Sequence, residues 1–524
     1  MSSPKRNRRW VKPGIALATG LVVVLLGGHR LADQHVRRVM GGPRAPVACL
    51  SCHVYMTGDN ILQRLLEEDY LSPRDLAVSP DGNRLYVVAE EAEALLIVSA
   101  TEGTVLNRIA LGKHPHSIVL SRDGQTAYVS NRWSDNVSVI DLSKGRVIRF
   151  LPTGNGPAGI ALGPGGNYLY VANSYSDDLS VIDLESGREK KRLAAGNNPY
   201  AVRLSPDGQS LFVTNRLSNP VAFRAPPVSE VTVVDTRSLR VTDRKAVPSA
   251  QMLESVDFAP EGDLALVTLA RPKNLLPASQ VRRGWMFTYG LGLVEPGEEG
   301  RVVQLLLDEV NAYFADPYDV VVMPDGRKAF VTHAGANSIS VVDMAALRAV
   351  LDRATPDSLA LFANHLGLSS QYVIKRIPTG ANPQRLALAP DGRRLYVAER
   401  LEDRIAVIDT DVLDTVQIID LGGPKQVSTL RLGERLFHQA RAFQGQFSCR
   451  SCHPDGDQDA LSWDFGGDGV GRNIVNTMTL RDIGETAPFK WAGTNVSLYM
   501  QDGIRFAKFL TRVEPFSPKE LRAV

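Results

Sequence analysis

The chain has 524 residues, of which 44% are hydrophobic, and its formal net charge is only +2. This length exceeds one ordinary core and predicts either several domains or one large repeat architecture. Lys and Arg are interspersed with Asp and Glu rather than clustered, so the sequence does not have the basic stretch of a nucleic-acid-binding protein.

The first thirty residues have the pattern of an export segment. Five basic residues lie between positions 5 and 12, and residues 14–28 are all apolar or small. Such a stretch spans about 22 Å as a helix, less than the ~30 Å membrane core, which suits a signal peptide. No A-x-A-like cleavage site follows, which suits a retained anchor. We expect residues 1–30 to direct a periplasmic or other extracytoplasmic location, with tethering to the inner membrane by residues 14–28 left open.

All four cysteines belong to two copies of the motif C-x-x-C-H, the attachment signature of c-type haem. The motif residues are Cys49, Cys52 and His53 in the first copy, and Cys449, Cys452 and His453 in the second. Two thiols bond the porphyrin and the adjacent histidine becomes an axial ligand of the iron. A zinc half-site or a redox dithiol explains a lone C-x-x-C, but not two copies each followed by histidine. We expect two covalent haem c groups, the first in a short segment over residues 31–71.

The middle of the chain repeats. A turn of the type x-Pro-Asp-Gly recurs seven times, and the first three intervals are 42 residues each. The turns end at Gly82, Gly124, Gly166, Gly208, Gly262, Gly326 and Gly392. Short alternating β-branched runs surround each turn, which is the chemistry of β-hairpins. About four strands per repeat predict a mainly β chain with a seven-bladed β-propeller over residues 72–424.

The strings LYVANSYSDDLSVID and LFVTN closely resemble the YVTN-type β-propeller family. The resemblance covers about two-thirds of the chain and implies the fold while saying little about function. The later repeats are longer, and residues 270–316 and 345–378 include helix-like pieces. These insertions are expected to form a lid, a seat for the C-terminal region, or plain loops.

The residue after the first proline of each repeat, or its equivalent, is expected to line one opening of the propeller. These seven residues would form a first ring. The last residues of the seven strands that follow them are expected to form a second ring. From these rings we select His116, His333, Tyr200 and Glu254 as a candidate site for a small ligand or metal. The alternative is that these side chains make water-mediated hydrogen bonds in a solvated funnel.

From residue 425 the repeat stops, and residues 425–524 predict an α-helical, cytochrome c-like domain around the second C-x-x-C-H motif. The strings LRLGERLFHQ, FSCRSCH and TAPFKWAG resemble the bacterial di-haem cytochrome c peroxidase and MauG family over about 100 residues. The resemblance implies that His453 is the proximal ligand, that Trp491 lies on an electron path between two haems, and that Asn473 lies near a calcium ion.

Two departures from that family affect the expected activity. No histidine follows His453, so the sixth ligand of the second haem is expected to be Met500, Met478, His438, a residue of another domain, or none. The second haem module of the family is also not found before Val524. Either the sequence is part of a longer protein or the motif at Cys49 supplies the second haem.

The motifs and the repeat together are consistent with three alternative functions. The first is an exported c-type cytochrome that transfers electrons to or from a small cytochrome or cupredoxin, with the propeller as docking platform. The second is a peroxidase-like oxidoreductase that acts on hydrogen peroxide or a related small oxidant at an open haem. The third is a propeller-based binding protein whose haems act as a redox sensor.

Overall fold

The computed structural model describes residues 70–222, 225–275, 286–464, 474–481 and 515–524, together with 483, 486–487, 489, 497 and 499. Residues 68–524 form one structural unit. Residues 1–67 form another, which lies outside the described residues, as do the first C-x-x-C-H motif and the apolar stretch 14–28. In the described part of the chain, no helix is long and apolar enough to cross a membrane.

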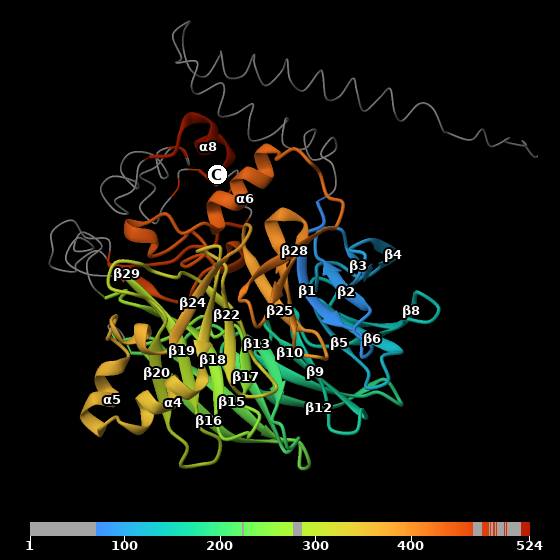
Figure 1. Ribbon diagram of the computed structural model, residues 1–524, viewed down its shortest axis with the longest axis horizontal. Helices are drawn as coiled ribbons and strands as arrows, with labels where there is room; N and C mark the ends of the chain where they lie inside the picture. The colour runs from blue at the N-terminus through green and yellow to red at the C-terminus, as the bar shows by residue number, and fades with distance from the viewer. Residues whose placement is uncertain are drawn as a thin grey trace, which may run out of the picture. The chain divides into compact units, whose positions relative to one another are not determined.

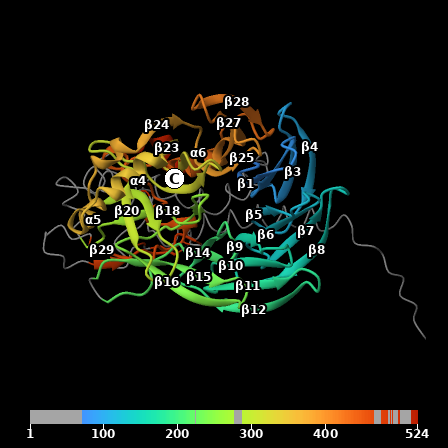
Figure 2. The same ribbon diagram turned by 60° about the horizontal axis from the view of Figure 1, so that its bottom comes forward.

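Seven antiparallel sheets of four strands make up most of the described residues. Each sheet consists of four consecutive strands paired in chain order. The sheets follow one another around a ring (Figure 2), and the first strands of neighbouring sheets pack against each other at its centre. The chain is therefore mainly β and contains a seven-bladed β-propeller, as the sevenfold repeat predicted.

The blades contain the following strands. Blade 1 has β1 (Pro73–Val78), β2 (Arg84–Ala89), β3 (Ala94–Ser99) and β4 (Val105–Ala110); blade 2 has β5 (Pro115–Leu120), β6 (Thr126–Asn131), β7 (Asn136–Asp141) and β8 (Arg146–Pro152); blade 3 has β9 (Pro157–Leu162), β10 (Tyr168–Asn173), β11 (Asp178–Asp183) and β12 (Arg188–Ala194); blade 4 has β13 (Pro199–Leu204), β14 (Ser210–Asn215), β15 (Val228–Asp235) and β16 (Arg240–Pro248). Blade 5 has β17 (Val256–Phe258), β18 (Ala265–Pro272), β19 (Phe287–Val294) and β20 (Val302–Leu306); blade 6 has β21 (Pro317–Val322), β22 (Lys328–His333), β23 (Ser338–Asp343) and β24 (Val373–Pro378); blade 7 has β25 (Pro383–Leu388), β26 (Arg394–Glu399), β27 (Arg404–Asp409) and β28 (Asp414–Asp420).

The repeated turn between the first and second strand of each blade needs its glycine. All seven turn glycines have φ between 68° and 75°, a conformation in which a side chain is strained. The turn also joins blades, because a Cβ on Gly124 would lie 2.7 Å from the proline ring of Pro80 in the preceding blade. The motif that revealed the repeat therefore sets both the hairpin and the spacing of adjacent blades.

Buried aspartates join the innermost strands of adjacent blades. Asp319 on β21 accepts hydrogen bonds from the main-chain N–H of Leu386 at 2.8 Å and from the guanidinium of Arg385 at 3.0 Å, both on β25. It also accepts one from Ser255 beside β17. Because Asp319 is only 5% exposed, these bonds replace the water that its charge would otherwise require.

The ring closes between blades 1 and 7, where β1 and β25 lie side by side (Figure 1). The main-chain N–H of Ser72 donates to Asp403 at 2.7 Å. Helix α6 (Thr429–His438) follows blade 7, and its buried Arg431 donates to the hydroxyl of Ser72 and to the carboxylate of Glu91. The start of the propeller is thus fixed by residues that follow its last strand.

The two insertions differ from each other. Residues 345–378 contain the predicted helical pieces, α4 (Met344–Asp352), α5 (Pro356–Phe362) and the one-turn helix η2 (Leu368–Gln371). The helix-like reading of residues 270–316 was wrong, because the described residues there form β19 and β20 of blade 5. A run of leucines and valines fits a buried strand as well as a buried helix segment, which is why the pattern misled.

The described residues after blade 7 contain few helices. They comprise α6, the one-turn helices η4 (Phe443–Gly445) and η5 (Pro454–Gly456), the strand pair β29 (Ser462–Asp464) and β30 (Ile474–Asn476), and α8 (Pro518–Ala523). One further one-turn helix, η3 (Arg400–Glu402), lies within blade 7. The strand pair had no counterpart in the sequence prediction. Helix α6 ends before the C-x-x-C-H motif, in keeping with the predicted order of elements.

Replacing Asp319 by alanine is expected to lower the free energy of unfolding by about 3 kcal/mol, because it leaves the buried guanidinium of Arg385 without its partner. Urea unfolding followed by circular dichroism measures this change. The control is Glu185→Ala at an exposed position, which should change stability by less than about 0.5 kcal/mol. Equal effects of the two substitutions would contradict the role given to Asp319.

Candidate functional site

The second C-x-x-C-H motif lies over one end of the propeller, which we call the mouth. The mouth is the end where the innermost strands begin and the second strands finish, marked by Arg74, His116, Tyr200 and Tyr318. The C-terminal segment crosses this end (Figure 1). Within the motif, the main-chain N–H of His453 donates to the carbonyl of Cys449 at 2.9 Å, so both thiols and the imidazole project from one tight turn.

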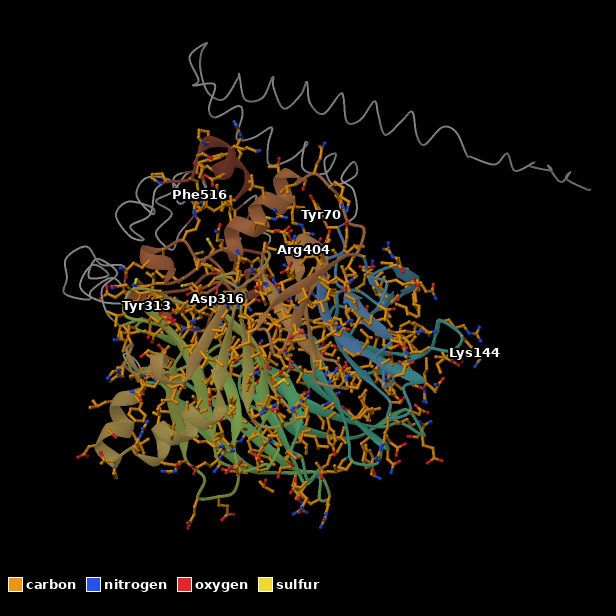
Figure 3. The ribbon with its side chains drawn as sticks, viewed as in Figure 1. Tyr70, Lys144, Tyr313, Asp316, Arg404 and Phe516 are labelled. Carbon is orange, nitrogen blue, oxygen red and sulfur yellow. The ribbon has the colours of Figure 1, made fainter. Side chains whose placement is uncertain are left out.

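Asp316, which precedes β21, anchors the turn from below. Its two carboxylate oxygens accept hydrogen bonds of 2.7 Å from the hydroxyls of Ser448 and Ser451. Figure 3 labels Asp316 where the propeller strands meet the C-terminal segment. The serine between the two motif cysteines is therefore a structural contact to the propeller.

An aromatic cluster packs on one side of the same turn. Phe287 on β19 contacts Trp463 on β29 and Phe447, with ring centroids 5.2 and 5.5 Å apart, and Cys452 packs against this cluster. The indole N–H of Trp463 donates to Asp459 at 2.8 Å. In addition, the main-chain N–H of Met286 donates to Gln446 at 2.8 Å. Of the three roles expected for the 270–316 insertion, the seat for the C-terminal segment is the one these contacts support.

A buried ion-pair network lies on the other side of the turn. Asp455, two residues after His453, accepts from Arg132 at 2.6 Å and from Arg216 at 2.7 Å. Arg450, between the two cysteines, donates to Glu254 at 2.5 Å. The network continues from Asp455 through Arg74 to Glu90 and Arg400. Through this network alone, the C-terminal segment is bonded to blades 1, 2, 4 and 5.

The charges of this network are fixed by their mutual contacts. Burial by itself would raise the pKa of Asp455, but the guanidinium groups of Arg216 and Arg132 outweigh it and hold that pKa well below its usual range. The pKa of Glu90 is likewise held down by Arg74 and Arg400 against the effect of burial. Both carboxylates are consequently ionised at neutral pH.

Three of the four residues predicted at the mouth lie in or against this network. Arg74 donates to the hydroxyl of Tyr200 at 2.8 Å and to Nε2 of His116 at 3.2 Å. Glu254 is wholly buried and bonded to Arg450. Burial and the nearby arginines lower the pKa of His116 well below its usual range, so its imidazole is neutral. Its Nε2 must accept from Arg74, which places the proton on Nδ1.

His333 lies apart from them. It ends β22, donates from Nδ1 to the carbonyl of Phe314 at 2.7 Å and is hydrogen-bonded through Nε2 to the hydroxyl of Ser340. Residues at the same register make equivalent bonds within their own blades: they are Asn131, Asn173 and Asn215. The second predicted ring therefore fastens strands within blades, and His333 does not join His116. Among the described residues, no group of three or more His, Cys, Asp or Glu side chains is arranged to hold a metal ion.

His333 should make stability sensitive to acid. Burial lowers its pKa to about 3, whereas the unfolded chain takes up the proton near pH 6.5. The stabilisation is present above pH 6.5 and is lost progressively as the pH falls toward 3. Between pH 6.5 and 5 the expected loss is about 2 kcal/mol. The substitution His333→Asn introduces the residue that three other blades have at this position, and it should remove this part of the pH dependence. Urea unfolding at several pH values measures it; an unchanged slope of the unfolding free energy against pH would contradict the assignment to His333.

The structure describes two of the three predicted sixth ligands. His438, the last residue of α6, is partly buried near Arg400 and Arg450, and desolvation together with these charges lowers its pKa well below the usual range. Its Nδ1 has no hydrogen-bond partner among the described residues. Met478 is 37% exposed, and its main chain lies next to the imidazole of His453. Met500, Trp491 and Asn473 lie outside the described residues.

Helices α6 and α8 pack together at a glycine. A Cβ on Gly433 would lie 2.0 Å from the carbonyl oxygen of Ala523, so only glycine permits this approach. Gly433 belongs to the LG-x-RLF string that precedes the haem motif. The contact joins the residues before the motif to a segment 90 positions later.

Gly433→Ala is expected to displace α8 and lower stability by about 1–3 kcal/mol, although alanine normally favours a helix. Faster hydrogen exchange in residues 518–523 would report the displacement. The control is Gly367→Ala, where an added Cβ would meet nothing closer than 3.4 Å. If Gly433→Ala leaves exchange unchanged or stabilises the protein, the proposed contact is wrong.

The described residues fit a covalently attached haem at the second motif. Cys449 and Cys452 are not joined in a disulfide, and burial raises the pKa of the Cys452 thiol. Burial also lowers the pKa of His453, so its imidazole is neutral and able to bind iron. The apolar face of Phe287, Phe447 and Trp463 beside Cys452 is suited to a porphyrin edge.

Sequence reasoning missed the arginines that hold Asp455. A signal was present at the position one residue after the second predicted ring, which follows the second strand in every blade except blade 5, where it lies within β18. Along the seven blades this position contains Glu90, Arg132, Ser174, Arg216, Ala270, Ala334 and Arg400. Three arginines at one register of a repeat predict a basic cluster at one end of the ring. Asp455 itself lies outside the repeat and gave no comparable signal.

The fold and the motif define a seven-bladed β-propeller with a C-x-x-C-H segment across its mouth. A family model described as Lactonase, 7-bladed beta-propeller matches residues 68–191. The chain is homologous to hydrazine synthase subunit beta of Kuenenia stuttgartiensis, at 30% identity over 182 residues. That match covers 35% of this chain and 47% of the relative, about half its length.

A solved structure of hydrazine synthase from the same organism is also similar. It superposes with a TM-score of 0.63 at 28% identity, covering 66% of this chain and 97% of the matched chain. The similarity to a hydrazine synthase chain is therefore one of both sequence and fold.

Proposed function

We propose that this protein is an exported c-type cytochrome that binds two covalent haems and transfers electrons, with the propeller as its docking platform. The observation that carries the proposal is the second C-x-x-C-H turn, which is bonded on one side to Asp316 and on the other to the arginines of the mouth. A rigidly held haem changes its surroundings little on oxidation or reduction, which favours electron transfer.

At the second haem, Cys449 and Cys452 would form the thioether bonds and His453 would bind the iron. Bound there, the haem supplies one-electron redox chemistry. Among the described residues, His438 is the partly buried candidate for the sixth ligand, whereas Met478 is 37% exposed and Met500 stays a prediction. At the first haem the corresponding residues would be Cys49, Cys52 and His53.

We further propose that residues 425–524 belong to a cytochrome c-like module of the di-haem peroxidase and MauG type. The order of α6 and the motif, with the contact of Gly433 to α8, supports this reading. Trp491 as an electron path and a calcium ion near Asn473 come with the same proposal. Location outside the cytoplasm, with or without an anchor at residues 14–28, follows from the chemistry of haem attachment.

The similarity to a hydrazine synthase subunit supports the proposal that this chain binds a partner protein. That relative is named as the beta subunit of hydrazine synthase, and a subunit belongs to an assembly. We propose that the propeller of this chain likewise docks a redox partner protein, such as a small cytochrome or cupredoxin.

The test is the haem content of protein matured in a bacterial host able to attach haem. Intact mass should exceed the polypeptide by two haems. The double substitution Cys449→Ala with Cys452→Ala should remove one haem, and Cys49→Ala with Cys52→Ala should remove the other. Ferric spectra should be low-spin and unchanged by hydrogen peroxide.

Two outcomes would contradict the proposal. A mass equal to the bare polypeptide would exclude haem attachment. A high-spin ferric haem that converts on addition of peroxide would instead support the peroxidase-like oxidoreductase.

A further inference from the structure

The ion-pair network at the mouth is not balanced in charge. Its members, linked by ion pairs of 4.0 Å or less among the described residues, are the arginines Arg74, Arg132, Arg216, Arg400 and Arg450 and the carboxylates Glu90, Glu254 and Asp455. His114 also contacts Glu90. Among the groups in direct ion-pair contact, five guanidinium groups thus face three carboxylates, an excess of two positive charges. Further carboxylates act on this set from beyond ion-pair distance: Asp316 on Arg450, and Glu434 and Glu91 on Arg400.

This excess is buried. The five arginine side chains are between 2% and 10% exposed. Water therefore cannot solvate them as it solvates surface arginines, and buried charge normally occurs with a counter-charge. Outside this network, the buried guanidinium of Arg385 has a direct partner of its own, Asp319, at 3.0 Å.

Several N–H groups of these arginines also have no hydrogen-bond partner. The buried unpartnered atoms are Nε of Arg74, Nε and Nη2 of Arg132, Nη1 of Arg400 and Nη1 of Arg450. A buried donor without an acceptor costs about 1–3 kcal/mol, more when it is charged. The same network contains one buried acceptor without a partner, Oε2 of Glu254, against five unpartnered N–H groups. Most of these donors therefore indicate acceptors that the described residues do not provide.

The arginines converge on two tyrosines. The guanidinium carbons of Arg74 and Arg450 lie 5.7 and 5.3 Å from the ring centroid of Tyr318. Those of Arg132 and Arg216 lie 5.9 and 4.5 Å from that of Tyr200. The hydroxyls of the two tyrosines are 2.9 Å apart. The surplus charge is consequently concentrated in one small volume, directly beneath the turn that contains Cys449 and Cys452.

We propose that the mouth arginines form a binding site for oxyanion groups that together bring about two negative charges. Guanidinium groups bind carboxylates and other oxyanions through paired N–H donors, which matches the unpartnered atoms. Two sources have this chemistry. One is the pair of propionate carboxylates of the haem at Cys449 and Cys452, which rests on the proposed function. The other is a free dissolved oxyanion, which does not.

Sulfate is a suitable probe because it is a divalent oxyanion. The full-length chain is produced in two forms: haem-loaded, and haem-free from a host compartment without haem attachment. Thermal unfolding is followed at increasing sulfate, with sodium chloride at matched ionic strength as the reference. The haem-free form should gain thermal stability from sulfate beyond that given by chloride.

Substitutions test whether the sulfate binds at the mouth arginines. Arg132→Gln and Arg400→Gln should weaken the apparent sulfate affinity of the haem-free form at least tenfold, whereas Arg132→Lys should restore part of it. Arg376→Gln is the matched control, because Arg376 is also largely buried but pairs with Glu309 outside the mouth. Should the haem-free wild type not fold, the double variant Cys449→Ala with Cys452→Ala, which retains the first haem, replaces it.

The haem-loaded form distinguishes the sources. Loss of the sulfate response on haem loading assigns the site to the propionates, and a retained response assigns it to a free oxyanion. A haem-free form that responds to sulfate no more than to chloride overturns the proposal, as does an equal loss of affinity in Arg376→Gln. Failure of haem attachment would appear separately in the intact mass and would leave the haem-free measurement decisive.

Discussion

One carboxylate that is ion-paired to arginines of several blades, Asp455, fixes how the C-terminal segment lies on the mouth. Asp455 is bonded to Arg132 of blade 2 and to Arg216 of blade 4, and the pKa of Asp455 is held low by those groups. Breaking such a buried pair on one side costs about 3–5 kcal/mol. The turn that ends in Asp455 contains Cys449, Cys452 and His453, so the ion pairs determine where these motif residues lie relative to the propeller.

The two sides of that turn have opposite character. Asp455 and Arg450 face the charged network, while Cys452 faces Phe287, Phe447 and Trp463. A haem has the same division, with an apolar ring and two charged propionates on one edge. The polar and apolar surfaces beside the motif are thus complementary to the proposed haem, and they would restrict its orientation.

The parts of the structure that depend on local rules could be predicted from sequence. The seven turn glycines require positive φ, and their recurrence gave the number of blades. His116, Tyr200 and Glu254 were placed at the mouth because inner strands repeat in register. His333 was misplaced because its register serves hydrogen bonds within the blade, as the asparagines of other copies show. The pairing of Arg132 with Asp455 spans 323 residues, and no local pattern encodes such a distance.

Each blade is built from consecutive strands, so in the described residues no sheet combines strands from the two ends of the propeller. The seam between blades 7 and 1 has no shared backbone ladder and relies on side chains, among them Asp403 and the Arg431 of α6. The segment that contains Cys449 and Cys452 therefore also holds the ring closed, through Arg431. Cutting the chain between Asp420 and Thr429 would separate this segment from a propeller that depends on it for closure, so the two parts depend on each other in folding.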